Sequence, residues 1–125
     1  MKKEITIAPP NSLVLLMDYE NGEIPEGFNG GLISSTSSCV AIGTLPEIDG
    51  LTYLKLSDDT PCLESKKMTL IFDGTIYLGG TEISLCTSEN QVLISLKVRS
   101  GKNRVEIYAN DKLVPDRIFI FIKQA

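Results

Sequence analysis

Apolar and polar residues alternate with a period of two along most of this chain, which is the pattern of β-strands that bury one face. In the segment 104–108, Val105 and Ile107 point to one side and charged residues to the other. The preceding segment repeats the pattern, with one apolar face made of Val92, Ile94, Leu96 and Val98. The alternation predicts strands at 3–7, 12–18, 38–43, 51–57, 67–73, 75–78, 81–86, 91–98, 102–109 and 117–123, one of which is expected to merge or drop out.

Turn-forming residues separate these segments at intervals of about eight to twelve residues. Among them, Asp73-Gly74 is predicted to form a tight hairpin between 67–73 and 75–78, because both residues tolerate positive φ. One longer connection, 19–37, is rich in Gly, Asn, Ser and Glu. Connections of this length are usually functional or mobile. A crossover between two sheets and a binding role are both consistent with it.

Residue usage supports β structure. Ile, Val and Thr together provide 29 residues, whereas Ala, the best helix former, occurs four times. The 125 residues are enough for one domain and one core, so we expect a single domain over 1–125. Many short strands at regular spacing predict an all-β fold, an antiparallel, jelly-roll-like β-sandwich of about nine strands with little or no helix. A barrel is the second choice.

The last predicted strand, 117–123, breaks the alternation with five consecutive apolar residues from Ile118 to Ile122. A strand of this kind needs cover on both faces. Phe119 and Phe121 form its second face, which is covered either by a loop of the same chain or by a second copy. The chain is therefore expected to be a monomer or a homodimer, with Phe119 and Phe121 as the candidate dimer contact.

Several kinds of chemistry are excluded by composition. The chain contains no histidine, so it cannot build a Ser or Cys triad with histidine or a histidine-ligated catalytic zinc site. A hydrolase built from this sequence would need two converging carboxylates, a Ser/Lys pair or a hard-metal site. A carboxylate-dependent enzyme is the alternative function, and no pair of carboxylates stands out. Cys39, Cys62 and Cys86 form no C-x-x-C pair, and we expect inert thiols, with one disulfide plus a free thiol as the alternative. We predict a non-enzymatic protein without a cofactor.

The net charge of −4 conceals an uneven distribution. Residues 18–64 contain nine acids and one base, and the rest of the chain carries a net charge of +4. Acidic loops attract a basic partner at long range, although the same charges also serve solubility. We therefore predict a protein-binding or inhibitory module that acts through acidic loops, with candidate contact residues Glu20, Glu23, Glu26, Asp58 and Asp59.

Two other binding functions are alternatives. Asp58 and Asp59 could bind Ca²⁺ together with Asp49 or Asp111, since Ca²⁺ prefers oxygen ligands on loops at the end of a sandwich. No D-x-D-x-D spacing occurs, and no metal is predicted. A carbohydrate site should carry exposed aromatic residues, whereas the chain has no Trp and four Tyr.

Nucleic acid and membrane are not expected partners. The basic stretch 97–104 is interpreted as a solvated hairpin, because few aromatic residues are available to stack on bases and the chain is acidic overall. The N-terminus, Met1 to Ile7, lacks the apolar run of a signal peptide. The apolar stretch Leu13 to Met17 is far shorter than the roughly 20 residues that cross a bilayer. A cytoplasmic location is expected.

Several features follow one another along the chain: Gly27-Phe28 in the long connection, the short strand Cys39 to Ile42, the Gly79-Gly80 turn, the run 100–108 and an apolar strand after Pro115. In this order they resemble a group of small bacterial all-β proteins of the competence-associated nuclease inhibitor type. The resemblance covers most of the chain. It implies an all-β fold and a binding or inhibitory role.

Overall fold

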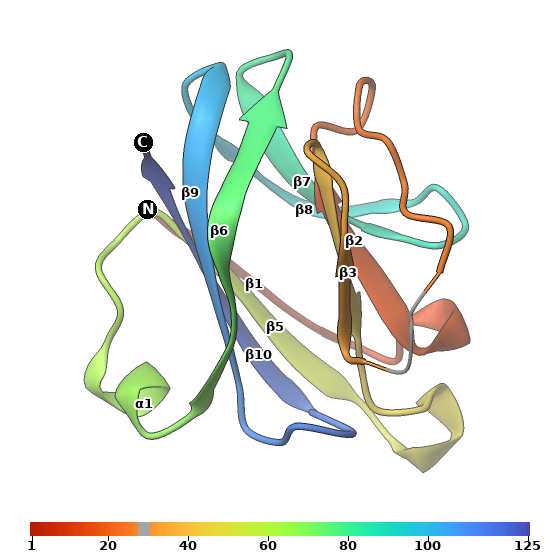
Figure 1. Cartoon of the computed structure of the whole chain (residues 1–125). Coiled ribbons are helices and arrows are strands. Elements are labelled where there is room, and N and C mark those ends of the chain that lie inside the picture. The colour runs from red at the N-terminus through yellow and green to blue at the C-terminus, as the bar shows by residue number, and fades with distance from the viewer. Residues whose placement is uncertain (28–30) are drawn as a thin grey trace.

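Two five-stranded sheets pack face to face in the computed structural model, which describes residues 1–27 and 31–125 (Figure 1). The first sheet has the strand order β1-β5-β10-β9-β6, and the second has the order β3-β4-β2-β7-β8. The predicted all-β sandwich with almost no helix is thereby confirmed. Phe28, which belongs to the expected Gly-Phe pair, lies outside the described residues.

Strands account for most of the regular structure. The first sheet contains β1 (Lys2–Ile7), β5 (Thr52–Ser57), β6 (Thr69–Leu78), β9 (Gly101–Ala109) and β10 (Arg117–Gln124). The second contains β2 (Leu13–Met17), β3 (Ile33–Ser35), β4 (Cys39–Gly43), β7 (Glu82–Thr87) and β8 (Val92–Lys97). The helical pieces are the one-turn helix α1 (Leu63–Lys66) and the 3-10 turns η1 (Pro10–Ser12) and η2 (Glu47–Asp49). Within the described residues, no helix is long and apolar enough to cross a membrane.

The core lies between the two sheets, where alternate residues of the strands point inward. The first sheet contributes Leu54, Leu56, Ile76, Leu78, Val105, Ile107, Ala109, Ile118, Ile120 and Ile122. The second contributes Val14, Leu16, Val40, Ile42, Ile83, Leu85 and Leu96. These side chains are aliphatic and at most 3% exposed. The period-two pattern of the sequence therefore defines the inner faces of both sheets.

The strand β10 lies in the middle of the first sheet, between β5 and β9. It runs parallel to β5, with Ile118 paired with Leu54, and antiparallel to β9. The first sheet is therefore mixed, which corrects the expectation of a purely antiparallel sandwich. A central strand is covered on both faces, which explains why the sequence of β10 is apolar without alternation.

The predicted hairpin at Asp73-Gly74 does not exist, because β6 continues through both residues and pairs with β9 over its whole length. The Asp73 carboxylate accepts hydrogen bonds of 3.0 to 3.2 Å from the guanidinium of Arg104 on β9. A Cβ at Gly74 would lie 2.8 Å from the Cζ atom of Phe72. A side chain at this position would require the Phe72 ring to move, so the glycine leaves room for this ring and does not mark a turn.

The predicted apolar face of β8 is wrong at Val92. The pairing of β7 with β8 shifts after Leu85, so that Cys86 faces Val92 and Leu93 is left as the extra residue. Val92 consequently points outward and is 41% exposed, whereas Leu93, Ile94 and Val98 pack against the core. A single bulged residue reverses the faces on either side of it.

The basic stretch 97–104 is not a hairpin, because it carries the chain from one sheet to the other. β8 pairs only with β7, and β9 pairs with β10 and β6. Gly101 has a φ of 94°, and the buried Asn103 side chain donates hydrogen bonds to the carbonyls of Arg99 and Gly101. The crossing is therefore built by one glycine and one buried amide.

Candidate functional site

An acidic segment, residues 18–27, runs over the outer face of the second sheet. Below it lies a second apolar cluster, made of Leu15, Met17, Cys39, Ala41 and Cys86 on β2, β4 and β7. Because the cluster is at most 4% exposed, the segment acts as the cover that these outward side chains need. The long connection predicted over 19–37 thus divides into this cover and the short edge strand β3.

Asp18 holds the beginning of the segment and is 7% exposed. One carboxylate oxygen accepts hydrogen bonds from the Gly80 amide (2.6 Å) and the Asn21 side chain (2.9 Å), and the other from the Glu20 amide (3.1 Å). These bonds, led by the one from Asn21, lower the pKa of Asp18. The ionised carboxylate ties the segment to the turn between β6 and β7.

A second contact holds the middle of the segment. The Glu23 amide donates a hydrogen bond to Ser38 Oγ (2.9 Å), and Thr36 Oγ1 donates one to the Glu23 carbonyl (2.6 Å). The backbone at Glu23 is therefore fixed to the connection between β3 and β4. Its carboxylate, like those of Glu20 and Glu26, stays exposed.

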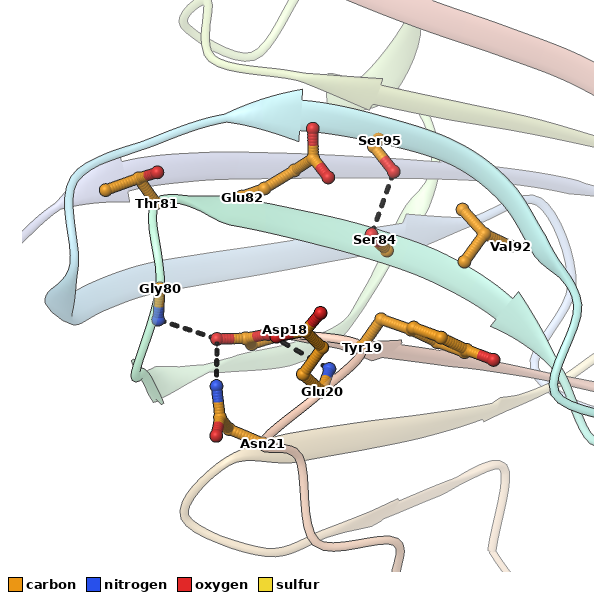
Figure 2. A pocket seen from close by; sticks show the side chains of 10 residues that line it. All are labelled: Asp18, Tyr19, Glu20, Asn21, Gly80, Thr81, Glu82, Ser84, Val92 and Ser95. Carbon is orange, nitrogen blue, oxygen red and sulfur yellow. Dashed lines mark hydrogen bonds between the residues drawn. The ribbon is translucent and has the colours of Figure 1, made fainter.

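A hollow of about 270 Å³ opens beside the segment, above β7 and β8 (Figure 2). Glu20 and Glu82 line it, and its floor contains the Oγ atoms of Ser84 and Ser95, 2.8 Å apart. Tyr19 forms part of the wall, and its hydroxyl donates to the Asn90 carbonyl at 2.9 Å. With Asp18, the hollow thus combines hydroxyl groups with three acidic side chains.

The opposite side of the segment borders a smaller hollow of about 210 Å³. Its walls are mainly apolar and include Leu13, Leu15, Ile24, Pro25 and Ala41. The segment therefore separates a polar, acidic hollow from an apolar one, and both open on the same face of the molecule.

The carboxylates on this face lack neutralising partners. Within the described part of the chain, no Lys or Arg nitrogen lies within 4 Å of the carboxylates of Glu20, Glu23, Glu26 or Glu82. We call this surface, formed by Asp18, Glu20, Glu23, Glu26 and Glu82, the acidic face. Lys97 lies opposite Glu82 in the pairing of β7 with β8, so the excess of negative charge rests mainly on Glu20, Glu23 and Glu26. Such an excess produces a field that attracts a basic molecule.

The other two candidate acids lie elsewhere. Asp58 and Asp59 follow β5 of the first sheet, and Asp58 Oδ1 lies 2.7 Å from the amino group of Met1. The structure therefore brings Glu20, Glu23 and Glu26 together on the acidic face but places Asp58 and Asp59 in the other layer of the sandwich. The five predicted contact residues form two separate groups.

The candidate calcium ligands do not converge. Asp58 and Asp59 follow one end of β5, whereas Asp49 precedes its other end. Asp111 lies in the loop before β10, where its Oδ1 accepts hydrogen bonds from the amides of Leu113 (2.7 Å) and Val114 (3.0 Å). These bonds lower the pKa of Asp111 and occupy the carboxylate in the turn.

Phe119 and Phe121 are 1% and 5% exposed within a single chain. Tyr53 contacts Phe119 edge-on at a centroid distance of 5.9 Å, and Tyr108 contacts Phe121 in the same way at 5.8 Å. Lys55 Nζ lies 4.4 Å from the centroid of the Phe119 ring. Residues of the same chain cover both rings, so their burial needs no second copy. We call the outer side of the first sheet the aromatic face.

All three cysteines are free. Burial raises the pKa of Cys39 to about 12 and that of Cys86 to about 11, so both stay protonated beneath the acidic segment. Cys62 is partly exposed beside α1, and hydrogen bonding from the Ser65 backbone lowers its pKa. Cys39 and Cys86 thus belong to the apolar cluster of the second sheet, whereas Cys62 lies apart from them beside α1 of the other layer.

Sequence reasoning missed three residues of the hollow, Glu82, Ser84 and Ser95. Glu82 lies outside the acid-rich range 18–64, and the two serines belong to strands that were predicted from their apolar positions. A usable signal existed in the alternation itself, because Glu82 and Ser84 are the outward positions of β7. Two successive outward positions of one strand that are both polar indicate that this part of the outer face is not covered by the acidic segment.

The fold is that of a two-layer β-sandwich protein, and comparison with known proteins shows which solved structures share it. No protein-family model matches the chain, and no curated protein sequence matches it. The solved structure of ComJ from Bacillus subtilis, an inhibitor of the DNA-degrading activity of NucA, is similar with a TM-score of 0.73. The match covers 98% of this chain and 96% of ComJ at 7% sequence identity.

The structure described as crocagin biosynthetic gene J is also similar. Its TM-score is 0.55 at 16% identity, over 97% of this chain and 96% of that one. Identities this low establish a shared fold and nothing finer. The resemblance to the nuclease inhibitor group, expected from the sequence, is therefore confirmed as a resemblance in fold.

Proposed function

We propose that this chain is a non-enzymatic protein that binds and inhibits a protein partner through its acidic face. The observation that carries the proposal is the likeness to ComJ over the whole length of both chains. The acidic face supplies the contact chemistry, because Glu20, Glu23, Glu26 and Glu82 are exposed. Within the described residues, none of their carboxylates has a Lys or Arg nitrogen within 4 Å.

The partner that fits an acidic face is a basic protein surface. Enzymes that degrade DNA bind phosphates with Lys and Arg, and such a surface attracts carboxylates as it attracts the nucleic acid. ComJ inhibits an enzyme of this type. We therefore propose that the partner is a DNA-degrading enzyme and that the acidic face occupies its basic DNA-binding surface.

The way in which the segment is held favours tight binding. The bonds at Asp18 and Glu23 fix its backbone before any partner arrives. A surface that is already ordered loses less conformational entropy on binding than a mobile loop does. The segment can thus present its charges at a small entropic penalty.

The separation of the acidic residues into two groups allows a matched test. Two variants with the same change in charge, E23K/E26K and D58K/D59K, are compared with the unchanged chain. Each is titrated into purified DNA-degrading enzymes, namely NucA and the nucleases of the cell that makes this chain. DNA degradation and the dissociation constant are both measured.

We expect inhibition by the unchanged chain and by D58K/D59K, and affinity reduced by about tenfold or more for E23K/E26K, since reversed charges juxtapose like with like. Equal inhibition by all three proteins would exclude the acidic face as the contact. Absence of binding and inhibition by the unchanged chain across these enzymes would overturn the proposed function itself.

A further inference from the structure

One end of the sandwich exposes large aliphatic side chains that serve no purpose in the core. Ile48 is 91% exposed, Leu51 61%, Leu113 81% and Val114 47%. They belong to η2, to the residue before β5 and to the loop between β9 and β10. We call these four residues the apolar tip.

The two loops that carry the apolar tip are joined by backbone hydrogen bonds. The Leu45 amide donates to the Pro115 carbonyl at 2.9 Å, and the Tyr53 amide donates to the Asp116 carbonyl at 2.8 Å. Figure 1 shows η2 and the connection between β9 and β10 at the same end of the molecule. The four side chains therefore belong to two loops that are bonded to each other at the same end of the sandwich.

The loop between β9 and β10 is held in place by its own side chains. Asn110 Nδ2 donates to the Asp116 carboxylate (2.6 Å), and Asn110 Oδ1 accepts from the amides of Asp116 (3.2 Å) and Arg117 (3.1 Å). Asp111 accepts from the next turn of the loop, as described above. A loop fixed by five such bonds exposes Leu113 and Val114 in one arrangement, so that little ordering is needed on binding.

The surroundings of the apolar tip are acidic. Glu47, Asp49, Asp111 and Asp116 accompany one base, Lys112, on these two loops. A second copy would bring two acidic rims together, and four side chains fall far short of the 20 to 30 or so residues per side of a standard interface. The partner that complements the tip is instead an apolar pocket bordered by Lys and Arg.

The apolar tip is continuous with the acidic face. Glu26 lines the smaller hollow together with Ser88, and Ser88 Oγ lies 3.4 Å from the Pro10 carbonyl of η1. The turn η1 contacts η2, which carries Ile48. A partner seated on the acidic face at Glu26 can therefore reach the tip without leaving the protein surface.

We propose that the apolar tip is a second contact for the same partner, and that it inserts into an apolar pocket at the edge of the basic surface of a DNA-degrading enzyme. This inference rests on the proposed function. The acidic face supplies long-range attraction and the tip supplies desolvated contact. A side chain that is desolvated in a pocket contributes more to the binding free energy than a charge exposed at the rim of an interface does.

The test compares two variants in which the substituted leucine is almost equally exposed. L113S/V114S changes the tip, and L63S is the control, because Leu63 is 79% exposed on α1 and Leu113 is 81% exposed. Thermal unfolding first shows that each variant is folded. Association and dissociation rates are then measured against the enzyme that the unchanged chain inhibits in the experiment above.

We expect L113S/V114S to dissociate about tenfold faster or more with an almost unchanged association rate, whereas E23K/E26K slows association in a salt-dependent manner. L63S should behave like the unchanged chain. If L113S/V114S binds and inhibits as well as L63S does, the tip is not a contact, and the acidic-face proposal still stands. If the unchanged chain inhibits no enzyme, both proposals fail together.

Discussion

On the outer side of β10, Phe119 and Phe121 lie against Tyr53 and Tyr108 and beneath the ammonium group of Lys55. On the outer side of the second sheet, aliphatic and thiol side chains of β2, β4 and β7 lie beneath the acidic segment instead. The aromatic face is thus covered largely by side chains of its own strands. The acidic face is covered by a separate length of chain that is attached at Asp18 and Glu23.

This difference determines which surface is available to a partner. On the aromatic face, Arg104 is paired with Asp73 and Arg117 with Glu64, so opposite charges neutralise one another. On the acidic face, the described residues provide no such pairing for Glu20, Glu23 and Glu26. Apolar residues on the outer side of a sheet show that this side needs cover. The charge of the covering residues then determines which kind of molecule the surface attracts.

Phe119→Ala should have the largest effect, because it removes the ring that joins Tyr53 and Lys55 on the aromatic face. Phe to Ala changes at buried positions lower the free energy of unfolding by about 3–5 kcal/mol. Urea denaturation followed by circular dichroism measures this loss. The control, L63A, changes an exposed side chain and should stay within roughly 0.5 kcal/mol of the unchanged chain.

The same variant tests the role of Phe119 in assembly. Since the ring is buried within one chain, the molar mass in solution should be the same for F119A and L63A under native conditions. A dimer of the unchanged chain that F119A converts to a folded monomer, without loss of stability, would show that Phe119 is a contact between copies.

Local alternation predicted the sandwich and its inner faces, but several outer features depended on contacts that are distant in sequence. Asp73-Gly74 has the composition of a turn, yet the bonds from Arg104 and the ring of Phe72 keep it in β6. The alternation places Val92 on the same face as Ile94 and Leu96, because the extra residue at Leu93 is visible only in the pairing with β7. Register shifts and cross-strand pairs of this kind leave no periodic trace in a single sequence.

The candidate site was predictable in part for the same reason. The acid-rich range 18–64 contains Glu20, Glu23 and Glu26, which the structure brings to one face. It also contained Asp58 and Asp59, which the course of β5 carries to the other layer. A charged stretch of sequence forms one charged surface only where the topology of the fold keeps the whole stretch on one side of a sheet.

Asp18→Asn should have the second largest effect, because it removes the charge that holds the acidic segment. Hydrogen bonds to a charged group contribute about 1.5–3 kcal/mol, and the nitrogen of the new amide would face a donor in either orientation: the Glu20 amide, or the Gly80 amide together with the Asn21 side chain. We expect about 2–3 kcal/mol of destabilisation and increased hydrogen exchange over residues 18–27. Asp49→Asn, an exposed acid on η2, is the control and should change little.

The contribution of Asp18 also depends on pH in a defined direction. Its pKa is lowered in the folded chain from the usual value of 3.8, so the unfolded chain takes up the proton first. The stabilisation is fully present above about pH 5 and is lost as the pH falls through the lowered pKa. The difference in unfolding free energy between the unchanged chain and D18N should therefore shrink between pH 5 and pH 2, and a constant difference would exclude the ionised carboxylate as the anchor.

Lys55→Met should have the smallest effect on stability. It also tests a difference between the two faces, because the thiol of Cys62 on the aromatic face is accessible and those of Cys39 and Cys86 are buried. Methionine keeps the apolar stem over Phe119 but removes the ammonium group, which lies 3.9 Å from Cys62 Sγ, so we expect a loss of about 0.5–1 kcal/mol.

The pKa of Cys62 is lowered mainly by the Ser65 backbone and further by Lys55, so its alkylation by iodoacetamide near neutral pH should slow in K55M. Cys39 and Cys86, with pKa values raised to about 12 and 11, should stay unlabelled in the folded chain. Lys97→Met removes a base from the second sheet and should leave the labelling of Cys62 unchanged. Equal slowing in both variants would mean that overall charge, rather than the position of Lys55 on the aromatic face, controls that thiol.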